Sequence, residues 1–213
     1  MNNIVNLTKG YIETIITIKK QFIFIGIAAV IFGVIGEQFI VYSPAVAVIL
    51  LVNQVLAYED ISKIDFLVAV LPVRKKEYVI SRYIGALIAL VISIIPMTIS
   101  YLLANLVNQS GITLSYVYFL IITITSSTVM ISAVIPINLK YGQKGRLITT
   151  LAKLLPLVLA MSMVEVLSSS NTFITIIRNP TTLILGVLVL DIILICISYF
   201  IAAKLYENKE VKK

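Results

Sequence analysis

Long apolar stretches separated by short charged segments dominate this chain. Hydrophobic residues occupy 60% of its 213 positions and charged residues only 13%, which leaves too few polar side chains to cover a water-soluble globule. Six apolar stretches are candidates for membrane-spanning helices, which need about 20 residues each. The second, counted to Tyr58, reaches only about 22 Å, so it is expected to continue past Glu59 or to include residues 39–42. The sequence therefore predicts an all-α, polytopic membrane protein with no room for a separate soluble catalytic domain.

The first 20 residues follow a different pattern from the rest. Their apolar residues recur at steps of three and four, and asparagine, lysine and glutamate lie between them. This periodicity predicts an amphipathic helix over residues 1–20 that lies on the cytoplasmic face of the membrane. The apolar positions are Ile4, Leu7, Tyr11, Ile15, Ile18 and Phe22.

Six predicted transmembrane helices make up a domain over residues 21–203. Ser43 and Pro44 open the second span as N-cap and first helical residue, and Pro96 predicts a kink in the third. A charged loop over residues 59–82 separates those two spans, and a basic tail over residues 204–213 follows the sixth. The spans are residues 21–40, 43–58, 83–107, 116–138, 151–167 and 182–203.

The placement of charge predicts how these spans are oriented. Sixteen of the 17 Lys and Arg residues fall on the side that holds both termini, and Arg178 is the exception. Cytoplasmic segments of membrane proteins are enriched in Lys and Arg, so both termini of this multi-pass protein are predicted to be cytoplasmic. The net charge of +7 thus reflects topology and attraction to the lipid bilayer, and gives no reason to expect nucleic acid.

The most specific string in the chain lies in the cytoplasmic loop. Residues 71–83 read Leu-Pro-Val-Arg-Lys-Lys-Glu-Tyr-Val-Ile-Ser-Arg-Tyr, after the acidic pair Glu59 and Asp60. The string resembles the loop before the third span of ABC-2 type permeases, the membrane subunits of a class of ATP-binding-cassette exporters. Arg74 stands where that pattern has serine or threonine. The matching residues are Leu71, Pro72, Val73, Glu77, Val79, Ser81, Arg82 and Tyr83.

In size and plan the chain is similar to the small permeases of phenol-soluble modulin exporters and of bacitracin-type resistance transporters. The resemblance implies that it pairs with a second copy or a sister permease, and with two ABC ATPase subunits. ATP and Mg²⁺ would bind to those subunits, so this chain would be neither an enzyme nor a holder of cofactors. The implied activity is export of an amphipathic peptide, toxin or antibiotic. The implied ATPase-coupling residues are Asp65, Phe66, Leu71, Pro72, Val73, Arg74, Lys75, Lys76 and Glu77.

The chemistry of the loop favours the same role. Its apolar residues 66–70 lead to Pro72, which stops a helix, and three adjacent cations follow. A short rigid element of this kind suits a groove in a soluble partner. The competing interpretation is a solvated loop whose cations only set the topology.

No motif for nucleotide binding or catalysis is present in the sequence. Gly142, Lys144 and Gly145 lack the spacing of a phosphate-binding loop, and the absence of histidine removes the usual zinc and Ser-His centres. The hydroxyl residues 126–128 are therefore expected to bond backbone carbonyls or neighbouring helices. If ATP drives this protein, another subunit must bind it.

Three acidic residues fall inside or beside the predicted spans. Asp191 lies about ten residues into the sixth span, where an ionised group is costly unless it faces a partner or water. It is either a group on the transport pathway or a structural hydrogen-bonding residue, with Asn53 or Gln54 as a candidate partner. Glu37 and Glu165, near the outer boundary, are weaker pathway candidates and fit solvated positions at the headgroups.

Two weaker features complete the sequence analysis. Two pairs of small residues, Ala29 with Gly33 and Gly85 with Ala89, have the four-residue spacing that permits close contact between helices. Two other functional classes also fit six small helices without an ATPase: the substrate-binding subunit of an energy-coupled vitamin uptake complex, and a non-transporting membrane immunity or scaffold protein. The first of these would lack the element at residues 71–83.

Overall fold

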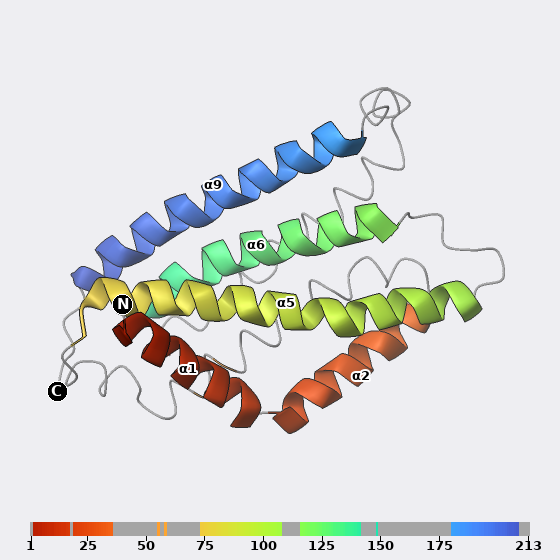
Figure 1. Cartoon of the computed structure of the whole chain (residues 1–213), viewed down its shortest axis with the longest axis horizontal. Coiled ribbons are helices and arrows are strands. Elements are labelled where there is room, and N and C mark those ends of the chain that lie inside the picture. The colour runs from red at the N-terminus through yellow and green to blue at the C-terminus, as the bar shows by residue number, and fades with distance from the viewer. Residues whose placement is uncertain are drawn as a thin grey trace.

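The computed structural model describes residues 2–17, 19–35, 55, 58, 73–107, 116–141, 148 and 180–208. Its described part is helical, without strands, and contains five helices (Figure 1). Helices are expected here because they satisfy every backbone hydrogen bond internally in lipid. The five are α1 (Asn2–Thr17), α2 (Lys19–Ile35), α5 (Lys75–Val107), α6 (Tyr116–Tyr141) and α9 (Pro180–Glu207).

Three of these helices are long and apolar enough to cross a membrane: Lys75–Leu106, Phe119–Tyr141 and Ile184–Glu207. They agree with the predicted third, fourth and sixth spans, so the membrane class of the protein is confirmed. The other three predicted spans, residues 21–40, 43–58 and 151–167, lie partly or wholly outside the described residues.

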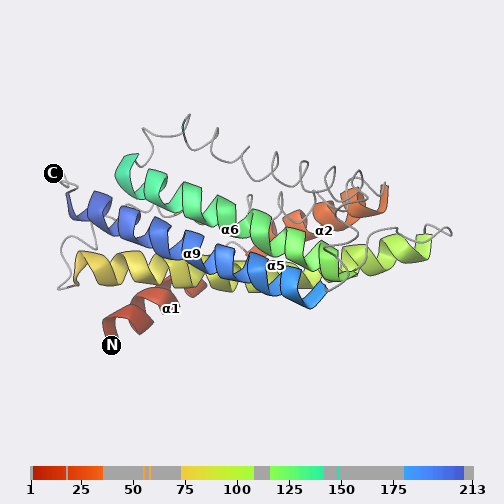
Figure 2. The same ribbon diagram turned by 90° about the horizontal axis from the view of Figure 1, so that it is seen from above.

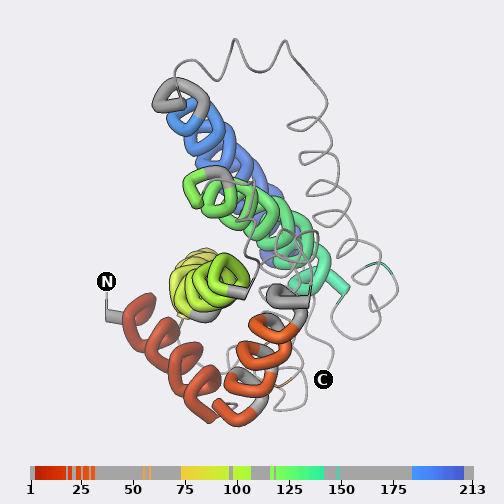
Figure 3. Tube along the Cα trace, turned by 90° about the vertical axis from the view of Figure 1, so that its right-hand side faces the viewer, coloured from red at the N-terminus to blue at the C-terminus, as the bar shows by residue number. Residues whose placement is uncertain are grey.

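Helix α5 lies between two pairs of helices (Figure 3). On one side α6 and α9 pack along each other, and on the other side α1 and α2 form a V whose two arms both contact α5. The 33 residues of α5 rise about 50 Å, more than the hydrocarbon core of about 30 Å. The helix therefore has length to spare beyond the bilayer.

Side-chain contacts establish the relative directions of the helices. Hydrogen bonds join Asp191 to Thr125 and Ser198 to Ser132, so α9 runs parallel to α6 with a constant offset of 66 residues. Helix α5 is antiparallel to both, and its first residues lie beside the last residues of α9 (Figure 2).

Helix α1 runs parallel to α5. Asn3 bonds to Glu77, and the ring of Tyr11 lies against Gly85, with the same offset of 74 residues. The apolar stripe predicted to contact lipid is used differently here, because Tyr11 and Ile15 are buried beside Ala89 of α5. An apolar periodicity predicts a face to bury, but it does not choose between lipid and protein.

Two helices extend past the predicted limits of their spans. Helix α5 begins at Lys75, eight residues before the predicted start, so residues 75–82 extend the span and are not loop. Helix α9 continues to Glu207, so the first residues of the predicted tail are helical. Charged residues precede the apolar stretch of α5 and follow that of α9, and no helix-breaking residue separates them from it. Hydropathy therefore indicates where the lipid-contacting part ends, which need not be where the helix ends.

Candidate functional site

Helix α5 starts within the string at residues 71–83, and a side chain caps that start. The backbone N–H of Arg74 donates to Glu77 Oε2 at 3.3 Å, while the carbonyl of Arg74 accepts the first helical bond from Tyr78 N. This is half of a capping box, with Arg74 as N-cap and Glu77 three residues later. In ABC-2 permeases the serine or threonine at this place would complete the box, and arginine cannot accept that bond.

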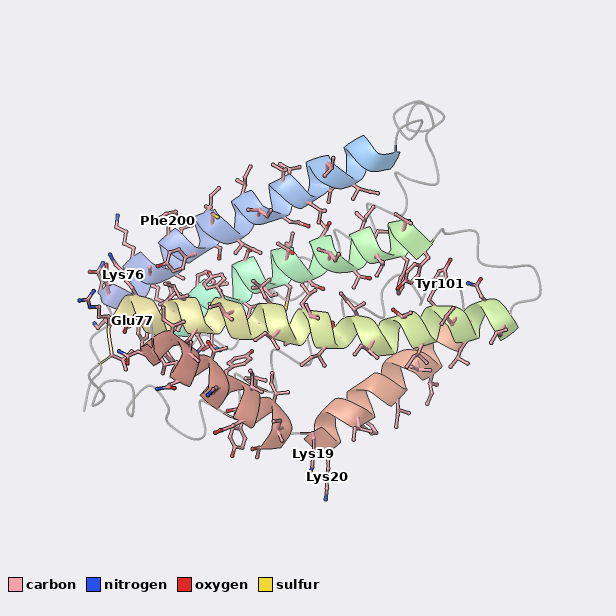
Figure 4. All side chains as sticks on the ribbon, in the orientation of Figure 1. Lys19, Lys20, Lys76, Glu77, Tyr101 and Phe200 are labelled. Atoms are coloured by element: carbon pink, nitrogen blue, oxygen red, sulfur yellow. The ribbon has the colours of Figure 1, made fainter. Side chains whose placement is uncertain are left out.

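Three helices meet at this end of the bundle. Lys75 Nζ donates to the backbone carbonyl of Glu207, at 2.8 Å, and so satisfies a carbonyl at the end of α9. Lys76 forms an ion pair with the Glu207 carboxylate at 3.5 Å, and Asn3 Nδ2 of α1 donates to Glu77 Oε2 at 3.3 Å. Figure 4 shows Lys76 and Glu77 at this end. The start of α5 is thereby tied to both α1 and α9.

One turn further along α5, a buried arginine lies among tyrosines. The guanidinium of Arg82 is 4.7 Å from the ring centroid of Tyr78 and 5.9 Å from that of Tyr11, and it donates to the Tyr78 hydroxyl. Tyr78 in turn packs on Tyr206 of α9, with ring centroids 5.2 Å apart. Cation–π contacts of this kind strengthen when they are desolvated.

Burial strengthens the preference of the tyrosine on α1 for its neutral form. Burial raises the pKa of Tyr11 to about 12, although the positive charge of Arg82 opposes this rise. The Tyr11 phenol is therefore neutral throughout the physiological pH range. We call the set of residues that joins these three helices the junction: Asn3, Tyr11, Lys75, Lys76, Glu77, Tyr78, Arg82, Tyr206 and Glu207.

Gly85 makes room for the ring of Tyr11. A Cβ added at Gly85 would lie 2.5 to 2.8 Å from three carbons of that ring, which is closer than packed carbon atoms can approach. Ala89, one turn on, is completely buried in the same cluster. The spacing of Gly85 and Ala89, noted in the sequence, is thus confirmed as a surface for close helix contact.

The last residues of the string connect α5 to the remaining pair of helices. The hydroxyl of Tyr83 lies 2.6 Å from Ser198 Oγ of α9, and that serine hydroxyl donates to the carbonyl of Ser132 in α6 at 2.7 Å. Ser81 donates to the carbonyl of Tyr78 within α5. Arg82 and Tyr83 therefore face different neighbours, α1 on one side and α9 on the other.

The predicted ATPase-coupling residues are only partly within the described structure. Val73 and residues 74–77 lie at the start of α5, with Arg74, Lys75 and Lys76 exposed. The other predicted members, Asp65, Phe66, Leu71 and Pro72, lie outside the described residues. The structure brings Lys75 and Lys76 together with Glu207 at the end of α9.

The predicted pathway acids are likewise divided. Asp191 is 4% exposed and accepts a hydrogen bond from Thr125 Oγ1, at 3.3 Å. Glu37 and Glu165 lie outside the described residues, as do Asn53 and Gln54, the candidate partners of Asp191. Thr125 was not among the partners that the sequence suggested.

The hydroxyl residues of α6 bond within their own helix, as expected. Ser126 donates to the carbonyl of Ile122 and Ser127 donates to that of Thr123. These hydroxyls are buried, and each satisfies its donor on the preceding turn. They carry no sign of a nucleophile.

Sequence reasoning missed the residues of α9 that complete the junction. Tyr206 and Glu207 were placed in a solvated tail. A signal was available, since Asp191, Ser198, Ala202 and Tyr206 are buried at helical spacing while their neighbours are large, exposed apolar residues. Small or polar residues in one stripe of an otherwise apolar helix mark the face that contacts protein.

These features define a helical protein with membrane-length apolar helices and a charged end where three of the helices meet. Within the described residues no group of side chains could hold a metal ion. A sequence model for the ABC-2 family of transporter proteins matches residues 11–207. The chain therefore belongs to the ABC-2 family of transporter proteins, the membrane components of transporters that normally work with an ABC ATPase. No curated protein and no solved structure matches the chain significantly.

Proposed function

We propose that this chain is the six-span permease subunit of an ABC-2 exporter, and that the junction transmits movement from a separate ATPase to the membrane helices. The observation that carries the proposal is the attachment of the start of α5 to both α1 and α9, through Glu77, Lys75 and Arg82. A push on this end would move three helices as one unit.

The directions of the described helices support six spans. Because α6 and α9 are parallel, the 38 residues 142–179 must return the chain from one end of the bundle to the other. Helix α2 ends beside the far half of α5 (Figure 1), so the 39 residues 36–74 must make a similar return before α5 begins. These are the regions where the sequence predicts the second and fifth spans, and an even number of spans leaves both termini in the cytoplasm.

The exposed cations at the start of α5 fit contact with a soluble subunit. Arg74, Lys75 and Lys76 are exposed at the end of a helix that is longer than the bilayer requires. The apolar and proline residues of the family string precede them directly in sequence. A partner that holds residues 65–77 would therefore pull on α5 through a rigid helix.

The remaining assignments rest on membership of the family. The protein would lie in the cell membrane with two ABC ATPase subunits, which bind ATP and Mg²⁺, and with a second permease, either a copy or a sister chain. Its cargo would be an amphipathic peptide, toxin or antibiotic. The chain itself would perform no catalysis.

A double substitution tests the coupling role. Replacing Leu71 and Val73 with aspartate places two charges in the proposed contact. We expect the ATPase to co-purify poorly and export to fall at least tenfold, while the protein still inserts into the membrane. Val5→Asp, at an exposed valine of α1, is the matched control and should have little effect. Unchanged co-purification and export in the double variant would remove the coupling role.

A further inference from the structure

A carboxyl group is buried halfway along the contact between α6 and α9. Asp191 Oδ2 accepts one hydrogen bond, from Thr125 Oγ1, whereas Asp191 Oδ1 is buried and has no hydrogen-bond partner among the described residues. An ionised carboxylate can accept several hydrogen bonds. This group thus receives much less compensation than its charge would need.

A second buried oxygen lies on the same contact. Ser132 follows Thr125 by seven residues and so shares its face of α6, and Ser132 Oγ also lacks a partner within the described residues. We call this row the seam: Thr125, Ser132, Asp191 and Ser198. It joins α6 to α9 with few hydrogen bonds and with two buried oxygens that could accept more.

No charged group in the described helices that pack around Asp191 compensates it. Over its facing length α5 has no charged residue from Tyr83 to Val107, and α6 has none before Lys140, which is 15 residues or about 22 Å from Thr125. On α9 the first charged residue on the junction side is Lys204. Apart from the exposed Cys196 of α9, the uncharged titratable groups of these helices are tyrosines. Four of them pair elsewhere: Tyr83 and Tyr199 near Ser198, and Tyr101 and Tyr116 near Phe119.

These surroundings favour the neutral carboxylic acid. A charge in a low-dielectric interior without a cation or several donors is far more costly than one unmade hydrogen bond of a neutral group. A bound metal is a weaker alternative, since one carboxylate and one hydroxyl provide few ligands. A proton needs no additional space beside a side chain that is 4% exposed.

We propose that Asp191 is a proton-binding site, occupied while the seam is closed and emptied when water enters between α6 and α9. Binding takes one proton from water and forms one O–H bond on the carboxylate, and release returns the proton to water. Because the closed seam binds the proton more tightly than the open one, low pH favours closure and rising pH favours opening. The site does not depend on the coupling role proposed above.

Infrared spectroscopy of the full chain in lipid nanodiscs tests the proposal. At pH 7 we expect the carbonyl stretch of a protonated carboxylic acid, and we expect Asp191→Asn to remove it. Thr125→Val removes the one donor that favours the charged form, so in this control the band should persist to higher pH than in the wild type. Absence of the band at pH 7, or its persistence in Asp191→Asn, would overturn the proposal.

A second measurement needs no variant, and so is independent of whether Asp191→Asn folds. A hydrophobic carbodiimide reacts with protonated carboxyl groups in apolar surroundings, and the modified residue can be located by mass spectrometry of peptides. We expect modification of Asp191 at pH 7 and at least a tenfold lower yield at a pH where the infrared band is lost. An unmodified Asp191 at pH 7, with the reagent shown to be active on another membrane carboxyl, would contradict a buried proton.

Discussion

The junction and the seam both hold helices together, but they differ in the polar contacts that cross between the helices. At the junction, residues of α1, α5 and α9 provide partners for one another, including the carbonyl at the end of α9 and the carboxylate of Glu77. At the seam, Asp191 Oδ1 and Ser132 Oγ are buried without partners among the described residues. Opening the junction would break its hydrogen bonds between helices. Opening the seam would let water donate hydrogen bonds to the two unpartnered oxygens.

This difference suggests a division of labour along the bundle. A region in which any displacement breaks favourable contacts keeps one geometry and can transmit movement. A region with unsatisfied buried oxygens gains hydrogen bonds to water when it opens, which lowers the free-energy cost of opening. The two helices of the seam also differ in exposure, since most of α6 is buried in the protein and most of α9 is exposed.

The largest effect is expected from breaking the junction at its buried cation. Arg82→Ala removes contacts with Tyr11 and Tyr78 and leaves the Tyr78 hydroxyl without this donor, and we expect a loss of about 2–4 kcal/mol in the free energy of unfolding. Thermal denaturation in nanodiscs measures it. Arg74→Ala, at an exposed arginine of the same helix, is the control and should cost less than about 0.5 kcal/mol. Equal losses in the two variants would mean that the stack does not stabilise the junction.

A smaller effect is expected where α1 rests on α5. Gly85→Ala places a methyl group against the ring of Tyr11 and should cost about 1–3 kcal/mol. Gly10→Ala is the matched control, because nothing lies within 4 Å of a Cβ there, and it should stabilise α1 by up to about 1 kcal/mol.

A double-mutant cycle sharpens this prediction. If the cost arises from the Tyr11 ring, Gly85→Ala should be nearly harmless in a Tyr11→Ala background. An additive double variant would show that Gly85 is required for another reason.

The smallest effect is expected at the cap of α5. Arg74→Thr supplies the hydroxyl that completes the capping box with Glu77, and should raise the free energy of unfolding by about 0.5–1 kcal/mol. Arg74→Val has a similar shape without the hydroxyl and serves as the control. If valine stabilised the protein as much as threonine, capping would not be the cause.

The sequence predicted the type of each element better than its limits or partners. Hydropathy located α5, α6 and α9, and the string at residues 71–83 pointed to Arg82 and Tyr83, which the structure places in contacts between helices. The sequence prediction missed the helical start at Lys75, because the three adjacent cations at residues 74–76 resemble a loop when only hydropathy is considered.

The sequence could not predict which residues of distant helices contact each other, and the reason is physical. The contact of Tyr11 with Gly85 depends on the offset between α1 and α5, and the bond of Asp191 to Thr125 depends on that between α9 and α6. Helical periodicity fixes which face of a helix is buried, but register between two helices comes from packing. The only sequence signal for such a contact was the four-residue spacing of small residues such as Gly85 and Ala89.

Distances between spin labels test most directly whether the junction moves as one unit while the seam opens. After Cys196 is replaced, one pair on Lys9 and Ile84 reports the junction, and another on Val117 and Leu185 reports the outer end of the α6–α9 pair; all four side chains are exposed. Adding ATP to the complex with its ATPase should leave the first distance distribution narrow and unchanged and should shift or broaden the second. A change in the Lys9–Ile84 distance with no change between Val117 and Leu185 would contradict the account.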